Sequence, residues 1–151
     1  MQSNFIYREA NDDDVAHLAE IRAANSATKD YWDDRIRKYS RALVSPQQAL
    51  EPRIIYLALD SDKVVGFVAG HLTRRLNCDG ELQWIDTVQG YRRKGIASDL
   101  IRILAKWFID HRAYKICVDP GDQIARDLYY KNGATNLNEH WLYWDDIRKI
   151  L

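Results

Sequence analysis

The chain has 151 residues and a mass of 17.7 kDa, enough for one domain with a hydrophobic core. Its 22 lysines and arginines balance 22 aspartates and glutamates, which argues against a protein dedicated to nucleic acids or membrane surfaces, because both classes usually carry a basic bias. Two cysteines without CxxC spacing, no export signal and no apolar run near the ~20 residues of a membrane span predict a reduced, cytoplasmic protein.

The first part of the chain is predicted to form one strand and two helices. Residues 4–10 form a short strand, and residues 11–14 then supply N-cap side chains for a helix with apolar residues at helical spacing over 15–26. The aspartate run at 12–14 could bind a metal, but capping with favourable charge at the helix start is the preferred interpretation. A second helix is predicted over 31–43 and ends before the segment SPQQALEP.

The rest of the chain is predicted to form antiparallel strands followed by alternating helices and strands. The strands are expected at 53–60, 63–72, 80–88, 113–121 and 140–144. An amphipathic helix is expected over 96–111, with Ala97 and Phe108 on its buried face, and a shorter helix over 122–133. Residues 145–151 are read as a tail. This order predicts a single mixed α/β domain over residues 1–151, without linkers.

Three cations stand at the start of the longest predicted helix, in the segment QGYRRKGIASDL. Arg92, Arg93 and Lys94 face the positive end of the helix dipole, where each usually costs about 0.3–1 kcal/mol. A bound polyphosphate removes this conflict, because the turn offers unpaired backbone N–H groups and Gly95 lets an anion approach closely. The letters exclude a Walker loop and a GxGxxG loop. The alternatives are a solvated turn paired with Asp86 or Asp99, and a nucleic-acid-binding module.

These residues resemble the signature of the GNAT superfamily of acyl-CoA-dependent N-acetyltransferases. The stretch from Arg92 to Ala97 matches the pattern Arg/Gln-x-x-Gly-x-Gly/Ala, and DQIARDLY resembles Asn-x-x-Ala-x-x-x-Tyr, with Asp122 in place of the usual asparagine. The order of elements also resembles that fold. The resemblance implies an α/β (α+β) fold with a central, mostly antiparallel sheet of about six to seven strands, flanked by about four helices.

The resemblance also implies an acetyl-CoA site, with no metal. The turn would hold the pyrophosphate, and backbone groups at the end of the preceding strand would pair with the pantetheine arm. An ionised aspartate cannot donate the hydrogen bond that the usual asparagine can, which puts the contact of Asp122 in doubt. The implied cofactor-binding residues are Thr87, Val88, Arg92, Arg93, Lys94, Gly95, Ile96, Ala97, Asp122 and Ala125.

Acylation of an alkylamine at pH 7 requires removal of a proton, at a cost of roughly 4.6 kcal/mol for a pKa of about 10.4. Glu81, eleven residues before Arg92, is the candidate base, because related enzymes place a base at that offset, and Asp86 is the fallback. Tyr129 of the second motif is the candidate acid for the thiolate. Strand alternation predicts two faces. One carries Glu81, Gln83, Ile85 and Thr87, and the other carries Leu82, Trp84, Asp86 and Val88.

The predicted function is transfer of an acetyl group from acetyl-CoA directly to a primary amine of a small molecule or peptide. Tyr31 and Trp32, which stand among the aspartates of residues 30–34, and Gln83 are the candidate acceptor-binding residues, since aromatic faces and carboxylates suit a cationic amine. A solvated helix start explains the same segment equally well. The alternative function is an acyl-CoA binder or sensor without catalysis. The aromatic segment 140–144 could join a homodimer interface.

Overall fold

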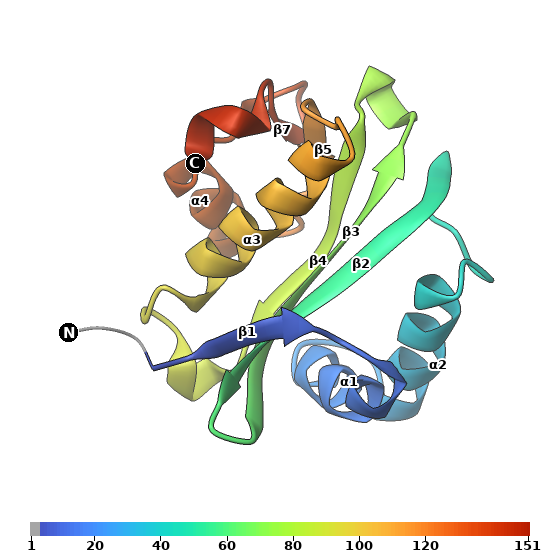
Figure 1. The fold of residues 1–151 in the computed structure, drawn as a ribbon, viewed down its shortest axis with the longest axis vertical. Coiled ribbons are helices and arrows are strands. Elements are labelled where there is room, and N and C mark those ends of the chain that lie inside the picture. Colours follow the sequence, from blue (N-terminus) through green and yellow to red (C-terminus); the bar gives the residue numbers. More distant parts are fainter. Residues whose placement is uncertain (1–3) are drawn as a thin grey trace.

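The computed structural model describes residues 4–151, which contain one seven-stranded sheet with strand order β1-β2-β3-β4-β5-β7-β6 (Figure 1). Neighbouring strands are antiparallel except β4 and β5, which run parallel. The strands are β1 (Ile6–Glu9), β2 (Ala49–Asp60), β3 (Lys63–Thr73), β4 (Gly80–Thr87), β5 (Ile116–Val118), β6 (Thr135–Asn136) and β7 (Leu142–Trp144). The α-helices are α1 (Val15–Ala23), α2 (Lys29–Ser40), α3 (Ile96–Asp110) and α4 (Gln123–Lys131). The predicted mixed α/β class is confirmed.

Helices cover both faces of the sheet, with α1 and α2 on one side and α3 and α4 on the other (Figure 1). Each face has its own apolar core. Leu18, Ile36 and Phe67 are among the buried residues of the α1/α2 face, and Leu100, Leu104 and Phe108 are among those of the α3/α4 face. The predicted amphipathic helix is therefore confirmed as α3, whose apolar side chains are buried, although Ala97 is only half-buried.

Local capping sets where the first two helices begin. Asn11 and Asp14 form a reciprocal capping box around the 3-10 turn η1 (Asp12–Asp14), which confirms the capping interpretation of this acidic run. The Thr28 hydroxyl accepts a hydrogen bond from the backbone N–H of Tyr31, so α2 begins at Lys29, two residues before the predicted start. The predicted extension of α2 to residue 43 is wrong, because the helix ends at Ser40.

Other boundaries also differ from the predictions: α1 ends at Ala23 and not at residue 26, and β7 begins at Leu142 and not at residue 140. Strand β2 begins at Ala49 and tolerates Pro52 because the β2–β3 register is interrupted between Ala49 and Arg53. Strand β5 has only three residues of the predicted nine. The predicted tail instead forms a 3-10 helix, η4 (Ile147–Ile150), because Ile147 is buried in the core under α3.

Strands β4 and β5 pair over a short distance and then separate. Their registered pairs run from Gly80 opposite Ile116 to Leu82 opposite Val118, whereas β4 continues to Thr87. Gly80 lets α3 approach this junction closely, since a Cβ there would lie 2.5 Å from the Phe108 ring. From residue 83 onward, the β4 edge that faces β5 has no strand partner in the described part of the chain.

Candidate functional site

The turn that leads into α3 presents a group of unpaired backbone amides. Gly95 is the N-cap with a φ of 84°, and Arg93 has a φ of 65°, so both residues adopt left-handed conformations that turn the chain sharply. Within residues 4–151, no acceptor pairs with the N–H groups of residues 93–98. A Cβ built on Gly95 would meet no atom within 4 Å, so the space beside these donors is open. The turn therefore has the donors and the access of an anion site.

The three cations of this turn form no ion pair with Asp86 or Asp99, the carboxylates that the sequence suggests as partners. Arg92, Arg93 and Lys94 are exposed, and none forms an ion pair with another described residue. Asp86 pairs with an arginine of α1, and Asp99 pairs with an arginine of its own helix. Pairing with Asp86 or Asp99 is therefore not seen among the described residues, whereas a solvated basic turn stays the alternative to an anion site, and the cations are available to an anionic ligand.

A β-bulge at Gln83 changes which side chains of β4 share a face. Ala69 of β3 lies opposite Trp84 but Gly70 lies opposite Leu82, which leaves Gln83 without a partner in the ladder. Because of this extra residue, Trp84 packs with the α1/α2 core and Leu82 with the α3/α4 core. The predicted alternation is thus wrong: Leu82 and Trp84 lie on opposite faces, as do Glu81 and Ile85.

Glu81 lies on the α1/α2 face and is almost completely buried, with 4% of its surface exposed. Its Oε1 is 3.5 Å from His71 Nε2, and its Oε2 is 3.6 Å from Nη1 of Arg75. Neither distance is a hydrogen bond, and Oε1 has no hydrogen-bond partner among the described residues. Glu81 is therefore a buried carboxylate with an acceptor atom still free.

Asp86 lies on the same face but has both oxygens occupied. Arg22 Nη1 donates to its Oδ2 at 2.9 Å, and Asn25 Nδ2 donates to its Oδ1 at 3.2 Å. Burial raises the pKa of Asp86 above its usual range, while Arg22, Asn25 and Arg92 oppose that shift. Asp86 is consequently engaged with α1, and its carboxylate is less free than that of Glu81.

Tyr129 of α4 is buried, with 3% exposure, and its ring packs edge-on against Trp144. Burial raises the pKa of the phenol far above its usual range, the nearby Asp86 charge raises it further, and Arg22 lowers it. The hydroxyl therefore stays protonated at neutral pH and can donate a proton. Smaller contributions that raise this pKa come from Asp119 and Asp122.

The other residues of the two motifs have mixed surroundings. The side chain of Ile96 is buried in the α3/α4 core, so only its backbone N–H can serve a ligand. Asp122 is the N-cap of α4 and accepts a hydrogen bond from the Ala125 N–H at 2.8 Å. Thr87 and Val88 are half-buried at the end of β4. Asp122 thus has a capping role that an asparagine could also fill.

Of the candidate acceptor-binding residues, Trp32 already contacts other side chains, whereas Tyr31 is exposed. The guanidinium of Arg22 lies 4.3 Å from the centre of the Trp32 ring, and the indole N–H of Trp32 donates to the Ser26 carbonyl. Tyr31 is 53% exposed, so its ring remains available. Gln83 has a buried Oε1 without a hydrogen-bond partner among the described residues. Because Arg22 lies against Trp32, that ring face is not open to a cationic amine.

Several polar residues of this region carry no recognisable motif. Arg22 and Asn25 bind Asp86, and His71 and Arg75 approach Glu81. The one signal in the sequence is His71, a histidine within the apolar strand segment KVVGFVAGHL. Its partner cannot be read from the sequence, because the bulge decides which residue of β4 lies opposite.

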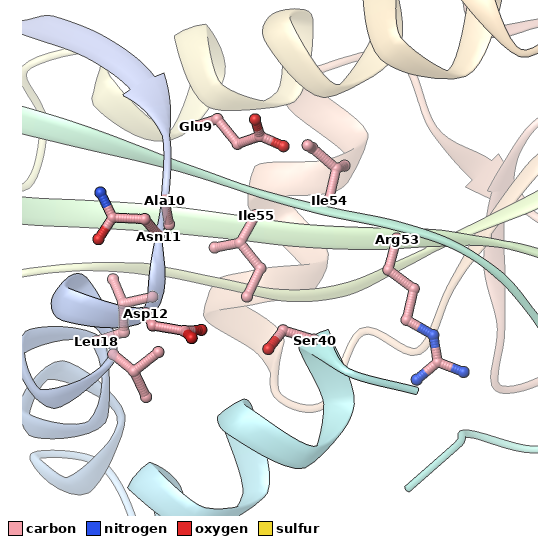
Figure 2. A pocket seen from close by; sticks show the side chains of 10 residues that line it. Glu9, Ala10, Asn11, Asp12, Leu18, Ser40, Arg53, Ile54 and Ile55 are labelled. Carbon is pink, nitrogen blue, oxygen red and sulfur yellow. The ribbon is translucent and has the colours of Figure 1, made fainter. Parts of the chain in front are cut away.

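A separate cavity of about 150 Å³ lies between the start of α1, the end of α2 and β2 (Figure 2). Asp12, Ser40 and Arg53 are among its lining residues, and the Arg53 guanidinium points away from Asn11 and Asp12 (Figure 2). None of the predicted site residues lines it.

Across residues 4–151, no His, Cys, Asp and Glu side chains form a group of three or more suited to a metal ion. In the same span, no helix has the length and apolar character needed to cross a membrane.

Comparison with known proteins gives one family match. The model of the acetyltransferase (GNAT) family matches residues 24–134. No curated protein sequence matches the chain.

Solved structures share the fold at low sequence identity. A 6'-N-acetyltransferase of aminoglycoside antibiotics from Acinetobacter haemolyticus has a TM-score of 0.74 and 15% identity, over 89% of this chain and 93% of its own. The PaiA N-acetyltransferase of Thermoplasma acidophilum, in complex with coenzyme A, has a TM-score of 0.66 and 16% identity, over 95% and 99%. Ard1 of Thermoplasma volcanium has a TM-score of 0.68 and 15% identity, over 93% and 97%.

Proposed function

The chain belongs to the acetyltransferase (GNAT) family, and from that premise we propose that it is an N-acetyltransferase that uses acetyl-CoA. The acceptor is a primary amine of a small molecule or peptide, and the acetyl group passes to it directly. The N-acetyltransferases among the similar structures include one for aminoglycoside antibiotics, whereas the features of this chain favour no one amine.

The observation that carries this proposal is the set of unpaired amides at the start of α3. The N–H groups of residues 93–98 open a helix of 15 residues, beside three exposed cations and a glycine without a side chain. This combination suits the diphosphate of coenzyme A. The PaiA structure of the same fold was obtained in complex with coenzyme A.

The separation of β4 from β5 supports an extended site for the rest of the same molecule. Beyond Leu82, the β4 edge that faces β5 has no strand partner within residues 4–151, up to Thr87 next to the amide turn. Amides of a pantetheine arm can pair with such an edge as an added strand would. This edge leads toward Glu81, so the thioester end of the ligand would lie near a buried carboxylate.

Glu81 is the base that the local contacts favour over Asp86. Oε1 of Glu81 has no hydrogen-bond partner among the described residues, whereas both oxygens of Asp86 accept hydrogen bonds. In this scheme the proton of the amine reaches the Glu81 carboxylate through one bridging water. Acetyl-CoA supplies an activated acyl thioester, and the amine displaces its thiolate.

Tyr129 is the acid in this scheme. Its phenol remains protonated because burial raises its pKa, so it has a proton to give to the departing sulfur. A thiolate needs this proton less than an alkoxide would, so the expected contribution of Tyr129 is smaller than that of Glu81.

Calorimetry with coenzyme A, followed by a thiol-release assay with acetyl-CoA and a panel of amines, tests the proposal. We expect binding of coenzyme A by the wild-type protein and turnover with at least one amine class. Glu81→Gln should lower kcat by roughly 10²- to 10⁴-fold and leave the Kd for coenzyme A within about two-fold. Tyr129→Phe should lower kcat by about 10-fold or more. The absence of any heat with coenzyme A would overturn the proposal.

A non-catalytic acyl-CoA sensor is the competing function. It predicts tight binding of acetyl-CoA, no thiol release with any amine, and no effect of Glu81→Gln on binding. The two functions therefore separate in the thiol-release assay, using the same protein and the same ligand.

A further inference from the structure

A row of buried polar side chains runs from α2 through β3 to Glu81. Tyr39 and His71 have no exposed surface, and Glu81 has 4%. The Tyr39 hydroxyl lies 2.9 Å from His71 Nδ1, and His71 Nε2 lies 3.5 Å from Glu81 Oε1. Arg75 approaches the other oxygen of Glu81 at 3.6 Å. Burial of so many polar groups is costly unless they form hydrogen bonds with one another.

The two unsatisfied atoms in this row face each other. His71 Nε2 and Glu81 Oε1 are both buried, and neither has a hydrogen-bond partner among the described residues. One proton between them satisfies both atoms after the side chains approach by about half an ångström, to ordinary hydrogen-bond length. Two facing lone pairs would instead leave both atoms unpaired and repelling.

The tautomer of His71 follows from these contacts. Glu81 as a carboxylate offers only acceptor atoms, so Nε2 must carry the hydrogen. A neutral imidazole then has a lone pair on Nδ1, which accepts the Tyr39 O–H. Burial raises the pKa of Tyr39 above its usual range, so the phenol keeps the proton that this arrangement requires.

We propose that Tyr39 and His71 are positioning residues for Glu81. The Tyr39 hydroxyl fixes His71 as the Nε2–H tautomer, and that N–H orients the Glu81 carboxylate, with Arg75 on its other oxygen. The inference deepens the proposed function and rests on it only where Glu81 is called the base. The arrangement of the three side chains is a property of the free protein.

The charged and titratable groups around the row come from every element packed against it. Arg53 of β2 lies 4.9 Å from the centre of the Tyr39 ring, and Arg75 stacks on Trp141 at 4.4 Å. Cys117 of β5 lies opposite Glu81 in the ladder, and Cys78 precedes β4. The neighbouring Cys78 side chain, and then burial, raise the pKa of the Cys117 thiol, so this neighbour stays neutral. Arg75 is thus the guanidinium next to Glu81, and His71 connects Glu81 to Tyr39 of α2.

The tautomer can be measured without any catalytic assay. Nitrogen-15 NMR of the imidazole rings reports which nitrogen carries the proton, and the chain has only four histidines to assign. We expect His71 as the Nε2–H form in the wild-type protein, and a mixture of forms in Tyr39→Phe. Tyr56→Phe is the matched control, because Tyr56 is half-buried on β2 with no hydroxyl hydrogen bond among the described residues. An Nδ1–H form of His71 in the wild type would overturn the proposal.

Kinetics with paired variants separate positioning from a merely structural role. His71→Gln keeps an N–H donor for Glu81, whereas His71→Met has similar volume and no donor. We expect Tyr39→Phe and His71→Met to lower kcat by about ten-fold, because the carboxylate loses the hydrogen bond that orients it. His71→Gln should recover most of the loss. The KM for acetyl-CoA should stay within about two-fold in all three variants.

The outcomes distinguish this inference from the proposed function. If the wild-type protein turns over and Tyr39→Phe leaves both kcat and the tautomer unchanged, the positioning role is wrong while the acetyltransferase stands. If no amine is acetylated but His71 is the Nε2–H form and loses it in Tyr39→Phe, the row exists and the assignment of Glu81 as base fails. Should His71→Met fail to fold, Tyr39→Phe decides, because it removes one buried oxygen and keeps the ring.

Discussion

At the scale of single residues, Glu81 and Asp86 show how one strand face gives two carboxylates different properties. Asp86 accepts hydrogen bonds from Arg22 and Asn25, and burial still raises its pKa. Glu81 has a free acceptor atom, 3.5 Å from a histidine whose facing nitrogen is equally unpaired. The residue type alone does not separate a structural carboxylate from a reactive one, and the hydrogen-bond partners do.

Asp14 provides a prediction for stability at this scale. It accepts two hydrogen bonds from Arg8 and one from the Asn11 N–H, and the hydrogen bond with Arg8 lowers its pKa. We expect Asp14→Ala to reduce the free energy of unfolding by about 2 kcal/mol at pH 7. Because the folded pKa is lowered, this contribution is present above the unfolded pKa of about 3.9 and is lost as pH falls through the folded value.

Urea unfolding of both proteins at pH 7 and at low pH checks this result. The stability gap between wild type and Asp14→Ala should close as the pH falls. Asp13→Ala is the control, because Asp13 is exposed and its side chain makes no hydrogen bond to another described residue. A gap that stays constant down to pH 2 would contradict the assigned cause.

At the scale of elements, the turn before α3 and the bulge in β4 build the site together. The turn supplies donors because Gly95 takes a left-handed conformation at the N-cap and no side chain caps the helix. The bulge rotates β4 by one residue, so that Glu81 and Trp84 share the α1/α2 face. A regular strand would have turned one of them toward α3 instead.

Gly95→Ala tests the turn. We expect a loss of about 1 kcal/mol in stability, because alanine is strained at a φ of 84°, and a roughly ten-fold weaker Kd for coenzyme A, because the Cβ enters the space beside the amides. Gly90→Ala is the matched control: it lies in the same loop, has no positive φ and has no atom within 4 Å of a Cβ. Equal effects of the two variants on the Kd would show that the turn does not hold the ligand.

At the scale of the whole molecule, the sheet joins two parts through the short pairing of β4 with β5. Three register pairs connect the β1-β2-β3-β4 part to the β5-β7-β6 part, and α3 and η4 pack across the junction. A ligand that lies along the free β4 edge and on the α3 amides would bind where the two parts separate. Binding should therefore stabilise the molecule as a whole.

Hydrogen exchange with and without coenzyme A checks this expectation. At a ligand concentration of about 100 Kd, the added stability should be about 2.7 kcal/mol. Protection should rise at residues 83–87 and 93–98, and it should change little in the β2–β3 hairpin away from the ligand. Protection centred instead on residues 9–12, beside the separate cavity, would place the ligand elsewhere.

The sequence by itself determined the features that depend on neighbouring residues. The mixed α/β order, the helix of residues 96–110 and the capping by residues 11–14 were predictable, because caps and amphipathic periodicity are local signals. The cation-rich turn before a helix was also recognisable, since its glycine and the helix start are adjacent in the chain, and its role as an anion site stays a prediction. The family resemblance rests on the same local motifs and is confirmed.

Only the tertiary structure decided which side chains meet. The bulge at Gln83 reversed the predicted faces of β4, and the burial of Ile147 turned a predicted tail into η4. The contacts of Glu81 with His71 and of Asp86 with Arg22 join residues on separate elements. Strand register and packing between distant segments are fixed by the whole core at once, and no short stretch of sequence carries that information.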